Sequence, residues 1–338
     1  MNDFCSTRTL IQVPASGRSC RPCAANRGPS HGMGTGRPIH GRRMNTGARR
    51  RREGMTSAEF VRPFPAMTPA QRYHLDVFGY VVIENTLSAD EVGRLHEGMQ
   101  RLKRDLLAAD EGEYVRGCRL GANHPHHRHF AHILEADEAI YDYLTHPRLV
   151  GLVEELVGGT VRLEESEAVI NTRAAETKWD GRYGFHTGTR PDIGTYTENG
   201  LYHCTFVKTL TNLTELGPDD GGTVCIAGSH KIKASREEII DCAYEDRSLI
   251  HQVVAPAGST LLFGEALIHA TGHLTSDRER VIVIGGYTPT MFQAWNGQEP
   301  SAGFVEAQVQ PQHRALISGS DKWQWQQRHR SLGTPAAD

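Results

Sequence analysis

The order of hydrophobic patterns along the chain is the feature that most limits its fold. In the first part of the folded region apolar residues recur at helical spacing, as in the run Leu95, Met99, Leu102 and Leu106. From about residue 161 onward short strands take over, broken by clusters of Gly, Asp, Asn and Pro. The predicted strands are 161–170, 201–212, 222–226, 250–254, 259–263 and 280–287. Helices followed by a run of strands predict one α+β domain built around a barrel or sandwich.

Local signals mark the ends of the predicted helices. Thr68-Pro69-Ala70-Gln71 and Ser88-Ala89-Asp90-Glu91 are capping boxes that each begin a helix, and the first of these helices stops at Gly79. Two more helices are predicted over 137–145 and 147–157, the second with a proline at its start and two glycines at its end.

Residues 1–54 are a different kind of polymer from the rest of the chain. They hold 11 arginines, no lysine and only Asp3 and Glu53, so their net charge is about +9, against about −12 for the remainder. Gly, Arg, Pro and Ser dominate without any helical or strand period, which predicts disorder. An Arg-rich tail is compatible with nucleic-acid binding or with a transit peptide. We favour a third interpretation, in which Met55 opens a more ordinary sequence and the preceding stretch results from an early start codon.

Composition excludes several classes of protein. The chain has 338 residues, 38% of them hydrophobic, which is enough for a core without disulfide staples. No stretch approaches the roughly 20 apolar residues of a membrane helix, and no apolar signal-peptide core is present, so we expect a cytoplasmic protein without membrane contact. Cys20 and Cys23 have no second pair, which argues against a zinc site, and the later cysteines are expected to be reduced.

Several segments in a fixed order resemble a known family. They are Phe78–Asn85, the Gly-Ser-His-Lys turn at 228–231, and His269 followed eleven residues later by Arg280. Together with the Gly-Phe-His-Thr-Gly segment at 184–188, they resemble the phytanoyl-CoA dioxygenase-like family of iron(II)/2-oxoglutarate oxygenases, over about residues 71–289. The resemblance implies a double-stranded β-helix core, a cupin-like jelly roll, with the N-terminal helices flanking it.

The same resemblance assigns the cofactor residues. His186 and His269 would come from different strands, converge and bind Fe(II), for which neutral imidazole is a suitable ligand. Arg280 would pair with the distal carboxylate of 2-oxoglutarate through its planar fork of donors. Arg278, two residues earlier on the same strand face, is the competing candidate, and the spacing favours Arg280.

The metal-ligand motif departs from the family pattern. The family has His-x-Asp or His-x-Glu, whereas this chain has His186-Thr187-Gly188, and glycine supplies no ligand. In this respect the chain resembles the iron/2-oxoglutarate halogenases, in which chloride binds iron in place of the carboxylate. The implied reaction uses O₂ to convert 2-oxoglutarate into succinate and CO₂ and transfers chlorine to an unactivated carbon of the substrate. Gly188 would create the chloride position, and Thr187 would lie next to the metal, with the direction of its side chain left open.

Other interpretations remain open on the sequence alone. Asp192 or Glu198, in the loop after the motif, could replace the missing carboxylate and restore hydroxylation. Water could fill the vacant position, with the same result. A barrel that has lost iron would be a noncatalytic small-molecule binder, although retention of both histidines and of Arg280 argues against it.

Basic and aromatic residues near the first ligand motif suggest a planar, anionic substrate, through stacking and guanidinium pairing. The candidate contacts are Arg173, Trp179, Tyr183, Arg190, His126 and Arg128. The chain is similar overall to freestanding nucleotide halogenases of nucleoside-antibiotic pathways, which implies chlorination at the 2′ carbon of a deoxyadenosine monophosphate. That resemblance favours a small-molecule substrate over a carrier protein or a nucleic-acid polymer. The run His124–His129 fits a solvated loop equally well.

We therefore expect three parts in the chain. Residues 1–54 form a disordered basic segment, 55–310 the oxygenase-like domain and 311–338 a C-terminal extension. In that extension Trp323 and Trp325 alternate with glutamine and are expected to pack back onto the core.

Overall fold

The computed structural model of the protein describes residues 66–174, 179–189, 193–198, 200–294 and 297–320. The predictions for residues 1–54, Trp323 and Trp325 lie outside these ranges. The helices are α1 (Pro69–Phe78), α2 (Ala89–Ala108), α3 (Glu138–Leu144), α4 (Pro147–Val157), α5 (Arg236–Glu245), α6 (Ala302–Ala307) and α7 (Arg314–Ser318). The strands are β1 (Tyr80–Ile83), β2 (Arg119–His124), β3 (His127–Ala131), β4 (Val161–Asn171), β5 (Thr195–Glu198), β6 (Leu201–Cys204), β7 (Val207–Asn212), β8 (Val224–Ile226), β9 (Ile250–Gln252), β10 (Thr260–Gly264), β11 (His269–Ala270) and β12 (Arg280–Pro289).

The first two helices begin where their capping boxes predict. The Thr68 hydroxyl accepts a hydrogen bond from the backbone N–H of Gln71, and Ser88 makes the equivalent contact at the start of α2. Helix α1 ends at Gly79, whose φ of 84° lies in the left-handed region that favours glycine. The apolar stripe of α2 is buried, as its helical spacing predicts.

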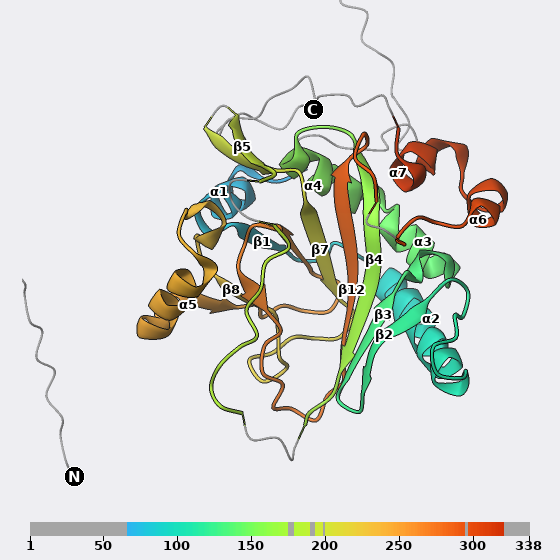
Figure 1. Ribbon diagram of the computed structural model, residues 1–338, viewed down its shortest axis with the longest axis horizontal. Coiled ribbons are helices and arrows are strands. Elements are labelled where there is room, and N and C mark those ends of the chain that lie inside the picture. Colours follow the sequence, from blue (N-terminus) through green and yellow to red (C-terminus); the bar gives the residue numbers. More distant parts are fainter. Residues whose placement is uncertain (1–65, 175–178, 190–192, 199, 295–296, 321–338) are drawn as a thin grey trace, which may run out of the picture. The chain divides into compact units, whose positions relative to one another are not determined.

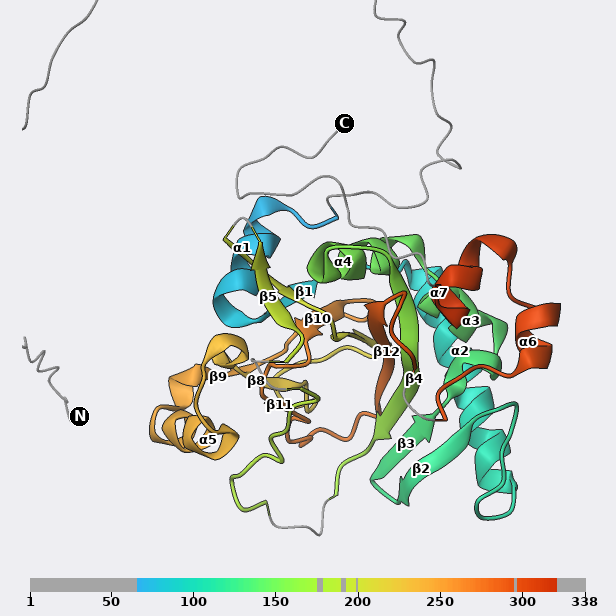
Figure 2. The ribbon, with the colours of Figure 1, turned by 45° about the horizontal axis from the view of Figure 1, so that its top comes forward.

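The strands form two antiparallel sheets and a separate hairpin. The large sheet has the order β1-β10-β7-β12-β4-β3-β2, the small sheet the order β11-β8-β9, and β5 pairs with β6. Strands β7, β12 and β4 lie side by side (Figure 1), and the turned view shows β8, β9 and β11 across from β12 and β4 (Figure 2). This arrangement confirms the predicted α+β class with a jelly-roll core.

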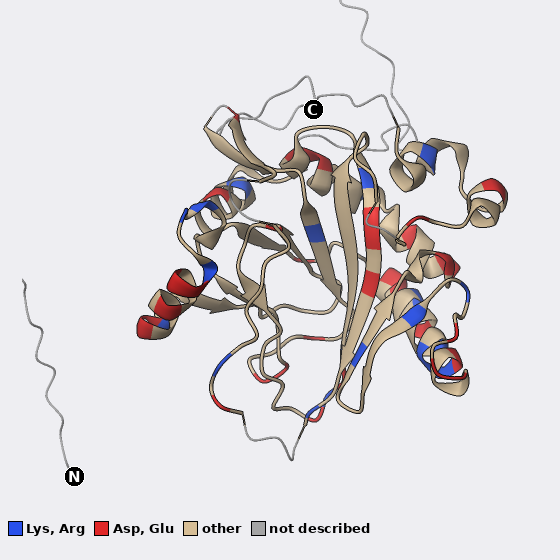
Figure 3. Cartoon of the chain, viewed as in Figure 1, with Lys and Arg blue, Asp and Glu red and all other residues tan. Residues whose placement is uncertain are grey.

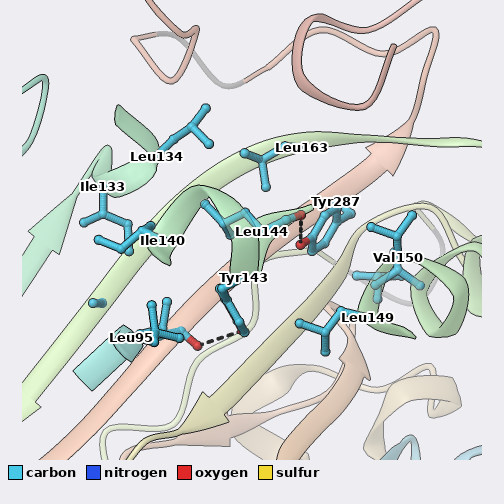
Figure 4. Close-up of a cluster of buried hydrophobic side chains, with 14 of the residues drawn as sticks. Leu95, Ile133, Leu134, Ile140, Tyr143, Leu144, Leu149, Val150, Leu163 and Tyr287 are labelled. Carbon is cyan, nitrogen blue, oxygen red and sulfur yellow. Dashed lines mark hydrogen bonds between the residues drawn. The ribbon is translucent and has the colours of Figure 1, made fainter. Parts of the chain in front are cut away.

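The two faces of the large sheet have different surroundings because side chains alternate along a strand. In β12, Val281 and Val283 point toward α2, α3 and α4 and belong to the main hydrophobic core. Further along the strand, Tyr287 donates a hydrogen bond from its hydroxyl to the carbonyl oxygen of Leu144 at 3.0 Å, which ties the sheet to α3 (Figure 4). Arg280, Ile282 and Ile284 point to the opposite face and line a cavity.

Some elements were not predicted from the sequence. The histidine-rich run spans the turn of a β2–β3 hairpin that joins the edge of the large sheet through β4. Helix α5 begins at a third capping box, Ser235 to Glu238. In α7, Leu316 and Ile317 are buried in the main core. No helix within the described ranges is long and apolar enough to cross a membrane.

Candidate active site

The interior face of the jelly roll encloses a cavity of about 460 Å³. Side chains from β4, β7, β10, β11 and β12 line it, together with the segment around Gly188. The cavity holds both histidines, Gly188 and Arg280, the residues on which the predicted chemistry depends. The fold therefore brings the segment that contains His186 and Gly188 together with His269 and Arg280, about 80 to 90 residues later in the sequence.

The two histidines meet through a single antiparallel bridge between their backbones. The N–H of each residue donates to the carbonyl oxygen of the other, at 2.9 and 3.0 Å, and the ring centroids are 4.4 Å apart. The Nδ1 of His269 lies 2.9 Å from the carbonyl oxygen of Leu267, and that of His186 lies 3.1 Å from the carbonyl oxygen of Gly184. Since a carbonyl only accepts, each Nδ1 is the donor, and each Nε2 keeps its lone pair for a metal ion.

The environment of His269 also suits metal binding. The residue is 8% exposed, and its ring lies 4.6 Å from that of Phe263. Burial, followed by the neighbouring His186, lowers the pKa of His269 to about 3. The imidazole is therefore neutral at physiological pH, which is the form that binds a metal.

Arg280 presents a buried guanidinium to the cavity. It donates from Nη1 to Oδ1 of Asn171 at 2.8 Å and from Nη2 to the hydroxyl of Thr223 at 3.3 Å, and its Nε has no partner among the described residues. No carboxylate of the described residues forms an ion pair with it. Burial lowers its pKa to about 10, so it is still a cation at neutral pH. A buried cation with a free donor is suited to a carboxylate ligand.

A carboxylate from elsewhere in the chain occupies the space beside Gly188. A Cβ atom built on this glycine would lie 2.6 Å from Cδ of Glu265, and closer still to its Oε2. The two segments are held together, because the N–H groups of Gly188 and Thr189 both donate to the carbonyl oxygen of Glu265 at 3.1 Å. Burial raises the pKa of Glu265, which is 7% exposed. An acidic side chain at position 188 would therefore collide with Glu265 in its present position.

One wall of the cavity is acidic, as Figure 3 shows along β4 beside the basic position on β7. Glu164, Glu165 and Glu167 line the cavity from β4. On β7, Lys208 forms a short ion pair with Glu165 and lies 3.9 Å from both Glu164 and Glu265. Burial raises the pKa of Glu164 to about 7. The cavity is thus more negative than the basic residues around the motif led us to expect.

The donor set fits a metal and an anionic cosubstrate, and sequence comparison supports the same conclusion. The model of the phytanoyl-CoA dioxygenase family matches residues 75–282, more than half of the chain. The chain belongs to this family. It is therefore an oxygenase-type enzyme of the iron(II)- and 2-oxoglutarate-dependent class, as the sequence resemblance implied.

Curated relatives of this phytanoyl-CoA dioxygenase family member are distant. Two proteins described as uncharacterised, one from Mycobacterium bovis and one from Mycobacterium tuberculosis, are each 23% identical to it over 230 residues. The alignment covers 65% of this chain and 74% of each relative.

Solved structures show the same fold at low sequence identity. HygX from Streptomyces hygroscopicus, with nickel and 2-oxoglutarate bound, is 22% identical with a TM-score of 0.55, and the match covers 75% of this chain and 97% of that protein. SnoN, an α-ketoglutarate-dependent epimerase from nogalamycin biosynthesis, is 19% identical with a TM-score of 0.51, and the match covers 77% and 98%.

The structure separates the two arginine candidates and places Thr187 in the lining of another pocket. Arg278 pairs with the buried Asp220 at 2.7 Å, whereas Arg280 lines the cavity. Thr187 lines a different pocket, next to Ser229 and the start of α5. The two proposed replacement carboxylates do not reach the site in the described ranges, because Asp192 lies outside them and Glu198 ends β5 away from the cavity lining.

The candidate substrate residues are dispersed. Trp179 and His126 line a neighbouring pocket that also contains Arg280, and Tyr183 packs against Trp179 with ring centroids 5.2 Å apart. Arg173 forms an exposed ion pair with Asp277, at 3.1 Å. The remaining two are Arg128, which donates to the carbonyl oxygen of Pro125, and Arg190, which lies outside the described residues.

Sequence reasoning missed Glu265, Lys208 and the glutamates of β4. A signal for Glu265 existed, because a lone carboxylate four residues before His269 follows a buried strand. No comparable signal marked Glu164, whose orientation depends on an irregularity in strand pairing.

Proposed function

We propose that this protein is an iron(II)/2-oxoglutarate-dependent oxygenase that oxidises a C–H bond of a small molecule, with Glu265 in the role of the missing carboxylate ligand. The observation that carries this proposal is the position of the Glu265 carboxyl group in the space that a side chain at 188 would need. The sequence left open a hydroxylase in which Asp192 or Glu198 supplies the missing carboxylate. Our proposal keeps the hydroxylase and assigns that role to Glu265.

Each residue of the site has a separate task. His186 and His269 would hold the metal through Nε2, because the backbone carbonyls of Gly184 and Leu267 fix the opposite ring nitrogens. Arg280 would hold the distal carboxylate of 2-oxoglutarate through its free Nε. When bound, iron and 2-oxoglutarate activate O₂ for oxidation of the substrate, with succinate and CO₂ as the other products.

Glu265 must turn to complete this ligand set. Among the described residues, no three His, Cys, Asp or Glu side chains are arranged to hold a metal ion. The Glu265 carboxylate contacts Lys208 only at 3.9 Å, so no strong ion pair opposes its rotation toward the histidines. A divalent cation would also compensate the cost of burying its charge.

Halogenation is the second candidate, and Gly188 is the observation that favours it. If Glu265 turned away from iron, chloride would have access to the vacant position. The electrostatics disfavour this alternative, because four glutamates line the cavity and a halide would enter next to one of them. We therefore place oxygen transfer ahead of chlorination.

The proposed substrate is a small molecule of natural-product type. HygX has been solved with hygromycin B bound, and SnoN with nogalamycin RO, each at a TM-score of at least 0.50. The cavity volume of about 460 Å³ is in the usual range for ligand sites. The acidic wall does not favour the deoxyadenosine monophosphate that the sequence suggested.

An exchange of the two positions tests the role of Glu265. We expect Glu265→Gln to weaken binding of Ni(II), used as an unreactive metal, by at least the 10- to 100-fold that even an outer-shell partner contributes. Gly188→Asp alone should also bind poorly, because its side chain collides with Glu265. The double variant Gly188→Asp/Glu265→Ala, which rebuilds His-x-Asp and removes the Glu265 atoms that the new aspartate would meet, should recover Ni(II) affinity and 2-oxoglutarate-dependent succinate formation.

A crystal of the Ni(II)/2-oxoglutarate complex grown in bromide distinguishes the two candidates. A Glu265 oxygen bonded to the metal supports the oxygenase. An anomalous bromine peak in that position, together with full Ni(II) affinity of Glu265→Gln, would refute our assignment and favour the halogenase. Glu84→Gln, which removes one exposed carboxylate, is the control for the loss of charge.

A further inference from the structure

A β-bulge turns two consecutive glutamates toward the cavity. The pairing of β12 with β4 shifts between Gly286, opposite Glu165, and Tyr287, opposite Leu163, so Glu164 has no partner of its own. In a regular strand, neighbours point to opposite faces, but a bulge places an extra residue and redirects its side chain. Both Glu164 and Glu165 consequently line the same cavity.

The opposite strand makes room for these carboxylates. A Cβ on Gly286 would lie 2.6 Å from Cγ of Glu165, 2.7 Å from Nζ of Lys208 and 3.0 Å from Oε2 of Glu164. Any larger residue at 286 would therefore displace the cluster. We call Glu164, Glu165, Glu167 and Lys208 the acidic end of the cavity.

The acidic end has more carboxylates than cations to balance them. Lys208 pairs closely with Glu165, and His129 lies 2.9 Å from Glu167. Glu164 is only 2% exposed, its Oε1 has no hydrogen-bond partner among the described residues, and Lys208 is 3.9 Å from its other oxygen. A buried carboxylate in this state is costly unless a cation or donor compensates it.

Arg280, the residue proposed to hold 2-oxoglutarate, lies away from the acidic end of the cavity. Arg280 and Gly286 are six residues apart on β12, which corresponds to about 20 Å along the strand. If 2-oxoglutarate binds at Arg280, it lies far from Glu164. The side chains of Glu165 and Glu167 are 15% and 20% exposed, so a ligand entering the cavity can reach them.

We propose that the acidic end binds an ammonium group of the substrate, and that the enzyme therefore acts on an amine-bearing small molecule. This inference rests on the proposed function, since it names the substrate class for the same cavity. An ammonium group would donate to Oε1 of Glu164 and to the carboxylate of Glu165 and would balance the excess negative charge. The same cavity is lined by the aromatic residue Phe206, a residue type that can also attract a cation. The raised pKa of Glu164 is consistent with a carboxylate that lacks a cation when no ligand is bound.

The test uses matched pairs of ligands and the full-length protein loaded with Ni(II) and 2-oxoglutarate. Glucosamine, tyramine and cyclohexylamine are each titrated beside the N-acetyl derivative, which has nearly the same shape without the positive charge. We expect at least one amine to bind detectably by calorimetry while its N-acetyl derivative does not. Glu164→Gln should weaken binding of that amine by about 10- to 100-fold, the usual effect of losing a hydrogen bond to a charged group.

Two further variants test whether the loss of amine binding is specific to the acidic end. Glu165→Gln should weaken amine binding in the same direction, because it also releases Lys208 as a competing cation. Glu84→Gln, at an exposed residue that does not line the cavity, should leave the affinity unchanged. Circular dichroism and 2-oxoglutarate affinity report whether each variant keeps the fold and the cofactor site.

Several results would overturn the inference. They are equal binding of amines and N-acetyl derivatives, full amine affinity in Glu164→Gln, tighter binding of deoxyadenosine monophosphate than of any amine, and the absence of binding by all three amines. None of these would affect the proposed oxygenase function if Ni(II) and 2-oxoglutarate still bind. Loss of Ni(II) and 2-oxoglutarate binding in the parent protein would instead refute the proposed function.

Discussion

Replacement of Glu164 by glutamine should stabilise the metal-free protein at alkaline pH. Glu164 is 2% exposed, and burial raises its pKa from an ordinary 4.5 to about 7, with Glu265 and Glu167 adding to the rise and Lys208 and Arg162 opposing it. The folded state therefore holds this proton more tightly than the unfolded state does. The contribution of Glu164 to stability is fully present below pH 4.5 and is lost as the pH rises through about 7.

The size of the effect follows from the difference between the two pKa values. Each pKa unit corresponds to about 1.4 kcal/mol, so ionisation of Glu164 lowers the free energy of unfolding by about 3 kcal/mol at most. Glutamine has nearly the same shape and no charge. We expect Glu164→Gln to exceed the parent protein in stability by up to about 3 kcal/mol at pH 8 and to differ little from it near pH 4.5.

Urea unfolding of both proteins from pH 4.5 to 8, in the presence of a chelator, measures this difference. Glu84→Gln serves as the control, because Glu84 is exposed and does not line the cavity. A stability difference that is the same at both ends of the pH range, or a less stable variant at pH 8, would refute the burial argument. An increase that also appears in Glu84→Gln would assign the effect to net charge alone.

Two other substitutions separate neighbouring roles. Arg280→Gln should weaken 2-oxoglutarate binding by about 10- to 100-fold. Arg278 pairs with Asp220, so Arg278→Gln should keep the parental affinity for 2-oxoglutarate. Equal losses of affinity in the two variants would contradict the assignment. Gly286→Ala should lower the free energy of unfolding by about 1–3 kcal/mol through contact with Glu165 and Lys208. Gly303→Ala, in α6 with open space around it, should be neutral or stabilising, and an equal loss there would remove the support for crowding at Gly286.

Much of the scaffold is predictable because its signals are local. Capping boxes at Thr68 and Ser88 fix where α1 and α2 begin, and Gly79 ends α1 through its positive φ. Strand β12 is predicted by its continuous apolar run. The β2–β3 hairpin escapes this reasoning, because its residues are polar and its position depends on backbone pairing with β4.

The site is predictable only where a family motif carries it. The sequence identifies His186, His269 and Arg280, and the structure places all three in one cavity. The neighbour of Gly188 cannot be found in the same way, because its contact with Glu265 forms only when two distant segments meet. The bulge at Gly286 is equally hidden, since strand periodicity would place only one of the neighbours Glu164 and Glu165 on the cavity face.

The acidic groups of the cavity share one structural principle. Gly188 leaves space that Glu265 fills, and Gly286 leaves space that Glu164 and Glu165 fill. Lys208 lies 3.9 Å from both Glu265 and Glu164, so it couples the two groups electrostatically. In the proposed metal complex, a Glu265 carboxylate turned toward the metal would leave Lys208 with less negative charge to balance there and more to offer Glu164. The proposed metal position and the acidic end would then form one charge network, which includes the absence of a carboxylate at 188.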